Sequence, residues 1–180
     1  MEAFRSAARR EDLGEGHEAR SDRMAKNTVV RHRGDGKAFW MLDSLYEVKA
    51  SGEETNGAMT IMEMTIPEGM GPPPHIHPGT ETVYVIEGTL RMHLGDEVVE
   101  GRPGSLFHIP EGTLERFEPT STVRLLVTYT PGDLDKFFAE AGEPTQRHEL
   151  PPRSDSPPDV DRFIEIAKRH GVEMKPMPED

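Results

Sequence analysis

Short segments rich in β-branched, aromatic and methionine residues make up the sequence between Asn27 and Thr130. The segments are NTVVRHR, KAFWMLDSLYEVKA, GAMTIMEMTI, TETVYVIEGTLRMHLGDEVVEG, SLFHIP, LERFEP and STVRLLVTYT. The clearest turn signals between them are Glu87-Gly88, Gly95-Asp96 and Glu111-Gly112. Such residue types favour strands, and such pairs favour tight turns. Many short strands at regular spacing predict an all-β sandwich or barrel.

The segments on either side of these strands have a different character. Residues 1–26 mix charges with Gly and Ala and lack an apolar period, which predicts a flexible arm. Met24, just before the first strand-like residues, is a candidate alternative translation start. The barrel is expected over residues 27–132. A two-helix extension, packed on the barrel, is expected over residues 133–171, with a tail at residues 172–180.

Apolar residues at helical spacing indicate the two helices. The first stripe is Leu134, Phe137, Phe138 and Ala141, and the second is Val160, Phe163, Ile164 and Ala167. We expect Asp133 to cap the first helix and Gly142 to end it, whereas Gly171 follows the second.

Composition narrows the classes of partner and site. A net charge of −12, without a Lys/Arg cluster, argues against nucleic acid. The chain has no cysteine, so a metal site must use His, Asp or Glu. No stretch approaches the ~20 apolar residues that cross a bilayer, and no signal peptide is recognisable, so we expect a cytoplasmic protein without a membrane partner.

A candidate metal site lies in the segment GMGPPPHIHPGTE. On a strand, His75 and His77 point to one face and present two imidazoles at a separation that one metal ion can bridge. Glu81, after the Pro78-Gly79 turn, can add a carboxylate oxygen. Two histidines and one carboxylate leave coordination positions open for water, substrate or dioxygen. The alternative is that these residues are polar groups at the edge of a loop.

This segment resembles the first motif of the cupin superfamily, in which glycine, His-x-His, glutamate and glycine follow at fixed spacing. The corresponding residues here are Gly69, His75, His77, Glu81 and Gly88. The resemblance covers residues 27–132. It implies a jelly-roll β-barrel that binds a divalent metal ion and commonly pairs as a homodimer.

The second cupin motif is recognisable from Gly104 through Pro110 and Gly112, but it departs from the family pattern afterwards. Glu115 stands where the family usually has its fourth ligand, a histidine, and Pro119 stands where an asparagine is usual. Three interpretations are open: Glu115 binds the metal ion, Glu115 turns outward and leaves a three-residue site, or the barrel binds a ligand without metal. Two carboxylates and two imidazoles would favour Mn, Fe, Co or Ni.

The segment PGDLDKFFAEAGEP resembles the helix that follows the barrel in single-barrel cupins similar to bacterial quercetinases. Those enzymes cleave flavonols with dioxygen and a divalent metal ion. The resemblance implies a metal-dependent dioxygenase acting on a small aromatic or enolic compound, in which Glu81 is both a ligand and the catalytic group that takes a substrate proton. The alternatives are a non-catalytic small-molecule-binding or sensory cupin and a sugar isomerase or epimerase.

Other residues have less specific roles. His108 is a spare candidate for the ligand shell or for substrate contact, whereas His93 is expected to face outward. The large apolar residues expected to fill the barrel are Met62, Met64, Met92, Phe107 and Phe117.

Overall fold

The computed structural model describes residues 28–153 and 159–177. Contacts divide the chain into residues 1–30 and residues 31–180, and the fold that follows is that of the second unit. The flexible arm predicted for residues 1–26 lies outside the described residues, and so does the end of the predicted tail.

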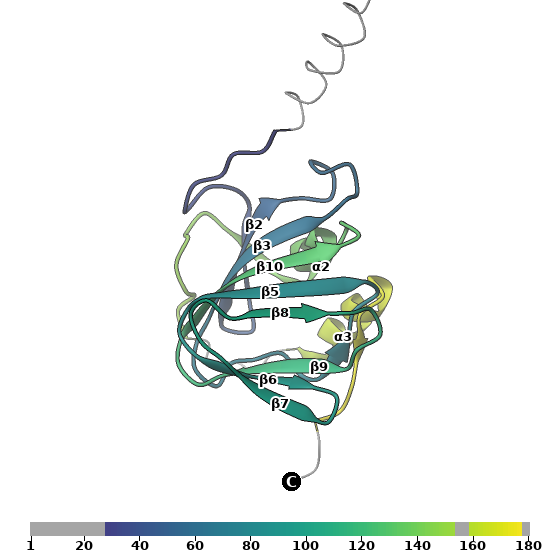
Figure 1. Ribbon diagram of the computed structural model, residues 1–180. Helices are drawn as coiled ribbons and strands as arrows, with labels where there is room; N and C mark the ends of the chain where they lie inside the picture. The colour runs from purple at the N-terminus through teal and green to yellow at the C-terminus, as the bar shows by residue number, and fades with distance from the viewer. Residues whose placement is uncertain (1–27, 154–158, 178–180) are drawn as a thin grey trace, which may run out of the picture. The chain divides into compact units, whose positions relative to one another are not determined.

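Two antiparallel sheets face each other (Figure 1). The larger has the order β11-β1-β2-β3-β10-β5-β8, and the smaller has the order β12-β4-β9-β6-β7. The strands are β1 (Ala38–Met41), β2 (Ser44–Ala50), β3 (Thr60–Ile66), β4 (His75–Ile76), β5 (Thr80–Glu87), β6 (Leu90–Leu94), β7 (Glu97–Gly101), β8 (Leu106–Ile109), β9 (Glu115–Pro119), β10 (Val123–Thr130), β11 (Glu143–Thr145) and β12 (Glu173–Met174). The predicted all-β jelly-roll fold is confirmed.

The core lies between the two sheets. Along β10 the inward residues are Val123, Leu125, Val127 and Tyr129, which alternate with more exposed ones. This alternation arises because successive side chains of a strand point to opposite faces. The residues predicted to fill the barrel, Met62, Met64, Met92, Phe107 and Phe117, are all buried, which confirms that prediction.

A matched pair of leucines tests this assignment. Leu125 is fully buried, whereas Leu106 on β8 is 61% exposed. We expect Leu125→Ala to lower the free energy of unfolding by about 2–5 kcal/mol, because it removes buried methyl groups and leaves a cavity. Leu106→Ala should change it by no more than about 0.5 kcal/mol. Urea unfolding of both variants measures the difference, and equal losses would contradict the assignment.

Helix α2 (Asp135–Ala141) and helix α3 (Val160–Arg169) form the C-terminal helical extension and lie on the same side of the barrel (Figure 1). α2 buries Phe137 and Phe138, and its C-cap is Gly142, as predicted. The predicted N-cap is wrong by one residue: Leu134 holds that position. The Asp133 carboxylate instead pairs with Lys136.

The buried face of α3 differs from the predicted stripe. Ile166 and Ala167 are buried and Phe163 packs against the core, but Val160 and Ile164 are exposed. After this helix, Met174 of β12 lies opposite His75 of β4, so the segment predicted as a tail begins with an edge strand.

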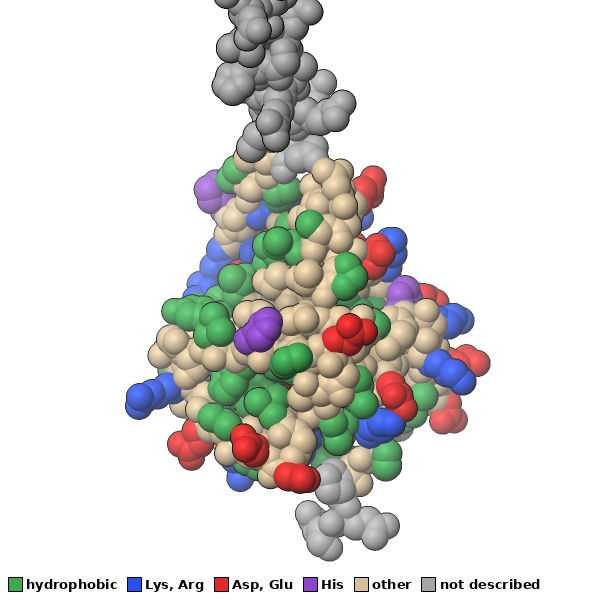
Figure 2. Space-filling view, turned by 45° about the vertical axis from the view of Figure 1, so that its right-hand side comes forward, with side chains coloured by type: hydrophobic (Ala, Val, Ile, Leu, Met, Phe, Trp, Pro, Cys, Tyr) green, Lys and Arg blue, Asp and Glu red, His purple; other side chains and the backbone are tan. Residues whose placement is uncertain are grey.

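On the face shown in Figure 2, acidic and basic side chains are interspersed among hydrophobic ones. Within residues 28–153 and 159–177, no helix has the length and hydrophobicity to span a bilayer. The homodimer, the absence of a nucleic-acid partner and the cytoplasmic location stay predictions.

Candidate metal centre

Four side chains from both sheets meet inside the barrel. His75 belongs to β4 and Glu115 begins β9, and these two residues lie opposite each other in the smaller sheet. Glu81 belongs to β5 of the larger sheet. His77 lies in the connection from β4 to β5, which crosses from one sheet to the other. The strand pairing and this crossing therefore bring the four residues together.

Two glycines allow the chain to pass closely around the site. A Cβ atom at Gly79 would lie 2.4 Å from the Thr130 carbonyl oxygen, so only glycine fits where the β4–β5 turn meets β10. Gly88 ends the strand that carries Glu81, with φ of +79°, and a Cβ atom there would lie 2.2 Å from the Thr122 carbonyl oxygen. A left-handed backbone with no room for a side chain requires glycine.

His77 is the centre of the cluster. Its Nε2 atom lies 2.9 Å from His75 Nε2, 2.8 Å from Glu81 Oε2 and 3.4 Å from Glu115 Oε1. One potential ligand atom from each of the four residues lies within 4.8 Å of all the others. Two nitrogens and two carboxylate oxygens are thus close enough to contact one ion.

A backbone carbonyl group on the side away from the cluster orients the His75 ring. Its Nδ1 atom lies 2.8 Å from the Pro73 carbonyl oxygen, which can only accept a hydrogen bond. The neutral ring therefore carries its proton on Nδ1 and presents the lone pair of Nε2 to the cluster. A carbonyl behind the ring commonly fixes metal-ligating histidines in this way. Pro73, just before β4, thus contributes directly to the site.

Burial disfavours charge on all four residues. It lowers the pKa of His75 to about 4 and also lowers the pKa of His77. Burial raises the pKa of Glu81 to about 7. Burial and the neighbouring Glu81 charge raise the pKa of Glu115 to about 9. A positive ion would offset the cost of holding two carboxylates in this apolar interior.

The cluster fits a divalent metal ion by a second criterion. Buried polar atoms are normally hydrogen-bonded. Within the described chain, however, four buried atoms of the cluster have no hydrogen-bond partner: His77 Nδ1, Glu81 Oε2, Glu115 Oε1 and Glu115 Oε2. Three of these are carboxylate oxygens, which are suitable ligands for Mn, Fe, Co or Ni alongside imidazole.

The structure decides between some of the sequence interpretations. Glu115 is buried and faces the two histidines, so the alternative in which it turns outward is wrong. His108 does not join the cluster. Its ring is exposed on β8 and lies 3.2 Å from the Thr82 hydroxyl. His93 lies on the outer face of β6, 3.2 Å from Glu118 Oε2, as expected.

A small inner cavity of about 40 Å³ adjoins the cluster. Phe137 and Phe138 of α2 and Phe163 of α3 line one part of it, and Tyr46 and Tyr129 of the larger sheet line another. Sequence analysis did not place these residues at the site. The alternation along β10 could have placed the Tyr129 side chain on the inner face.

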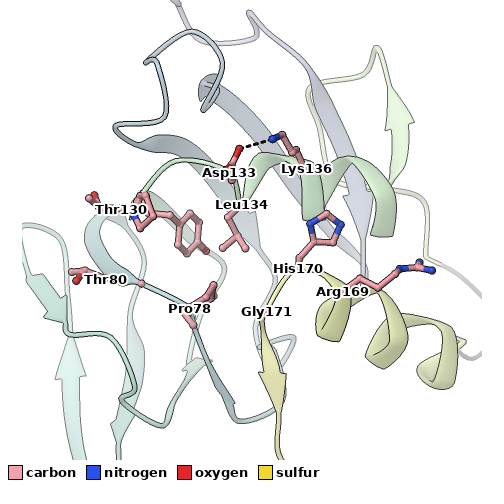
Figure 3. Close-up of a pocket in the computed structure, with 13 residues that line it drawn as sticks. Pro78, Thr80, Thr130, Asp133, Leu134, Lys136, Arg169, His170 and Gly171 are labelled. Carbon is pink, nitrogen blue, oxygen red and sulfur yellow. Dashed lines mark hydrogen bonds and ion pairs between the residues drawn. The ribbon is translucent and has the colours of Figure 1, made fainter.

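A larger outer pocket of about 360 Å³ shares two lining residues, His77 and Tyr129, with the inner cavity. The turn before β5, the start of α2 and the end of α3 surround it (Figure 3). Its rim carries the Asp133–Lys136 ion pair and His170. His77 and Tyr129 thus border both the inner cavity and the outer pocket.

Comparison of the sequence with known proteins agrees with the resemblance to cupins. Residues 62–129 match the sequence model of the Cupin domain. The chain is 28% identical over 124 residues to quercetin 2,3-dioxygenase of Bacillus subtilis (strain 168). This match covers 68% of the chain but only 37% of that protein, so the chain spans little more than a third of its length.

Solved structures show the same fold. A RmlC-like cupin from Shewanella frigidimarina has a TM-score of 0.54 at 14% identity, covering 59% of this chain and 93% of that one. The polyketide cyclase RemF from Streptomyces resistomycificus has a TM-score of 0.52 at 22% identity, covering 76% and 91%. Residues 62–129 are thus a Cupin domain by their sequence match, the two-sheet barrel has the fold of solved cupin structures, and the sequence is similar to that of quercetin 2,3-dioxygenase.

Proposed function

We propose that this cupin binds a divalent metal ion through His75, His77, Glu81 and Glu115, and that it is a dioxygenase acting on a small aromatic or enolic compound. The observation that carries the metal site is the convergence of four buried ligand atoms within 4.8 Å of one another. The relationship to quercetin 2,3-dioxygenase supports the choice of reaction.

The side chains around the centre have separate roles in this proposal. The metal ion, when bound, would act as a Lewis acid that polarises a substrate oxygen. Glu81, fully buried and beside His77, is placed to accept the proton of a substrate hydroxyl. The apolar walls supplied by Phe137 and Phe138 exclude water from the reacting groups.

The sizes of the two spaces restrict the way a substrate can bind. Ligand pockets typically measure about 300–1,000 Å³. The outer pocket falls in this range at about 360 Å³, but the inner cavity of about 40 Å³ does not. We therefore place the body of the substrate in the outer pocket, with its hydroxyl group directed past His77 toward the centre.

Metal analysis and oxygen uptake together test the proposal. We expect the purified protein to hold about one Mn, Fe, Co or Ni ion per chain and to consume dioxygen with quercetin or a smaller enediol. A chelator should abolish this consumption. Metal binding without oxygen uptake for any such compound would contradict the dioxygenase. Ligand-induced thermal stabilisation that survives chelation would instead support a non-catalytic binding cupin.

A further inference from the structure

Tyr129 is a buried residue of the centre that is not among the four proposed ligands. It lies on β10 directly opposite Glu81 of β5, so both side chains point to the inner face of the larger sheet. Its ring centroid is 5.1 Å from that of His77 and 6.1 Å from that of Phe138, and the residue is 6% exposed. The ring is therefore fixed between a proposed metal ligand and helix α2.

The hydroxyl group of Tyr129 makes no hydrogen bond with any residue that the structure describes. A phenol hydroxyl is protonated at neutral pH and can donate a hydrogen bond. Tyr129 thus offers an unused donor next to His77, Glu81 and Glu115.

The position of Tyr129 at the border of both spaces indicates what this donor can contact. Tyr129 and His77 border both the outer pocket and the inner cavity. A compound that extends from the outer pocket into the inner cavity along these shared residues contacts the Tyr129 side chain. An oxygen atom next to the one that reaches the centre would then lie beside the hydroxyl.

We propose that Tyr129 determines substrate specificity: its hydroxyl donates a hydrogen bond to one of two neighbouring oxygens of the ligand, and the other oxygen occupies the metal centre. This inference rests on the proposed function. The substrate class is accordingly compounds with adjacent oxygens, such as catechols, enediols and α-hydroxyketones. A compound with a single hydroxyl group gains nothing from Tyr129.

Catechol and phenol are the matched probes, because they differ by one adjacent hydroxyl. Their dissociation constants are measured by calorimetric titration of the metal-loaded wild type, Tyr129→Phe and Tyr84→Phe. Tyr84 is an exposed tyrosine on the outer face of β5 and provides the control. We expect Tyr129→Phe to weaken catechol binding about five- to tenfold, the loss of one hydrogen bond, and to leave phenol binding unchanged. Tyr84→Phe should leave both unchanged.

Each other outcome has a distinct meaning. Unchanged catechol binding in Tyr129→Phe, or an equal loss for both probes, overturns the specificity role. Chelator-sensitive binding of catechol by the wild type is required by the proposed function, and its absence overturns that function and this inference together. Phenylalanine keeps the ring between His77 and Phe138, and thermal unfolding with metal analysis verifies that the variant is folded and loaded. If it is not folded, wild-type protein that binds phenol as tightly as catechol overturns the inference.

Discussion

Replacing His77 by alanine is expected to lower the affinity for the metal ion at least about 100-fold. Mutation of a residue that only hydrogen-bonds to a metal ligand already lowers metal affinity by about 10–100-fold, and loss of the ligand itself should cost more. His77 should have the largest effect of the four residues, since its Nε2 atom lies within 3.4 Å of a potential ligand atom of each of the other three. Elemental mass spectrometry of the purified variant should find almost no metal. Added metal should raise the melting temperature of the wild type but not that of the variant.

His108→Ala is the matched control for this experiment. His108 is a histidine on β8, next to the strand that carries Glu81, but it lies on the outer face of the sheet and is exposed. We expect this variant to keep its full metal content. Stoichiometric metal in His77→Ala, or equal losses in the two variants, would contradict the assigned centre.

The second large loss of metal affinity is expected for substitution of Glu115. Glu115→Gln keeps the size of the side chain but removes the negative charge, so we expect metal affinity to fall by about 10–100-fold, as for other changes that perturb a metal site. Glu115→His supplies the imidazole that the family usually has at this position, and it should retain the metal ion. Metal titrations followed by calorimetry compare the two variants with the wild type.

Glu118→Gln is the control for Glu115→Gln, because both residues lie on β9 but Glu118 faces outward and pairs with Arg91. A surface ion pair contributes little, so this control should bind metal as the wild type does. If Glu115→Gln binds as tightly as the wild type, the centre consists of the two histidines and Glu81 alone.

Much of the centre can be predicted from the sequence because its first three residues are neighbours in the chain. The alternation of side chains along a strand places His75 and His77 on one face, and the short turn at Gly79 returns the chain to Glu81. The same local rules indicate the strands, since alternation and glycine turns depend only on nearby residues. These rules predict a β-barrel, and the spacing of the motif residues indicates a resemblance to the cupin superfamily.

The role of Glu115 depended on pairing between remote strands. Because a glutamate stands where the family usually has a histidine, the sequence does not tell whether the Glu115 side chain points into the barrel or out of it. Only the pairing of β9 with β4, which places Glu115 opposite His75, brings it into the cluster. Tyr129 is a similar case: strand alternation allows an inward side chain, but the pairing of β10 with β5 places it beside Glu81. Such long-range contacts have no local signal in a single sequence.

The sequence by itself determined the strands, the two helices and the histidine–glutamate triad, because each follows from the period or spacing of nearby residues. Only the tertiary structure decided which face each helix buries. Helix α3 docks through Phe163, Ile166 and Ala167 and leaves Ile164 exposed, although both sets have helical spacing. The buried face follows from where the helix meets α2 and the barrel, because burial of apolar area against these remote elements selects one of two amphipathic faces.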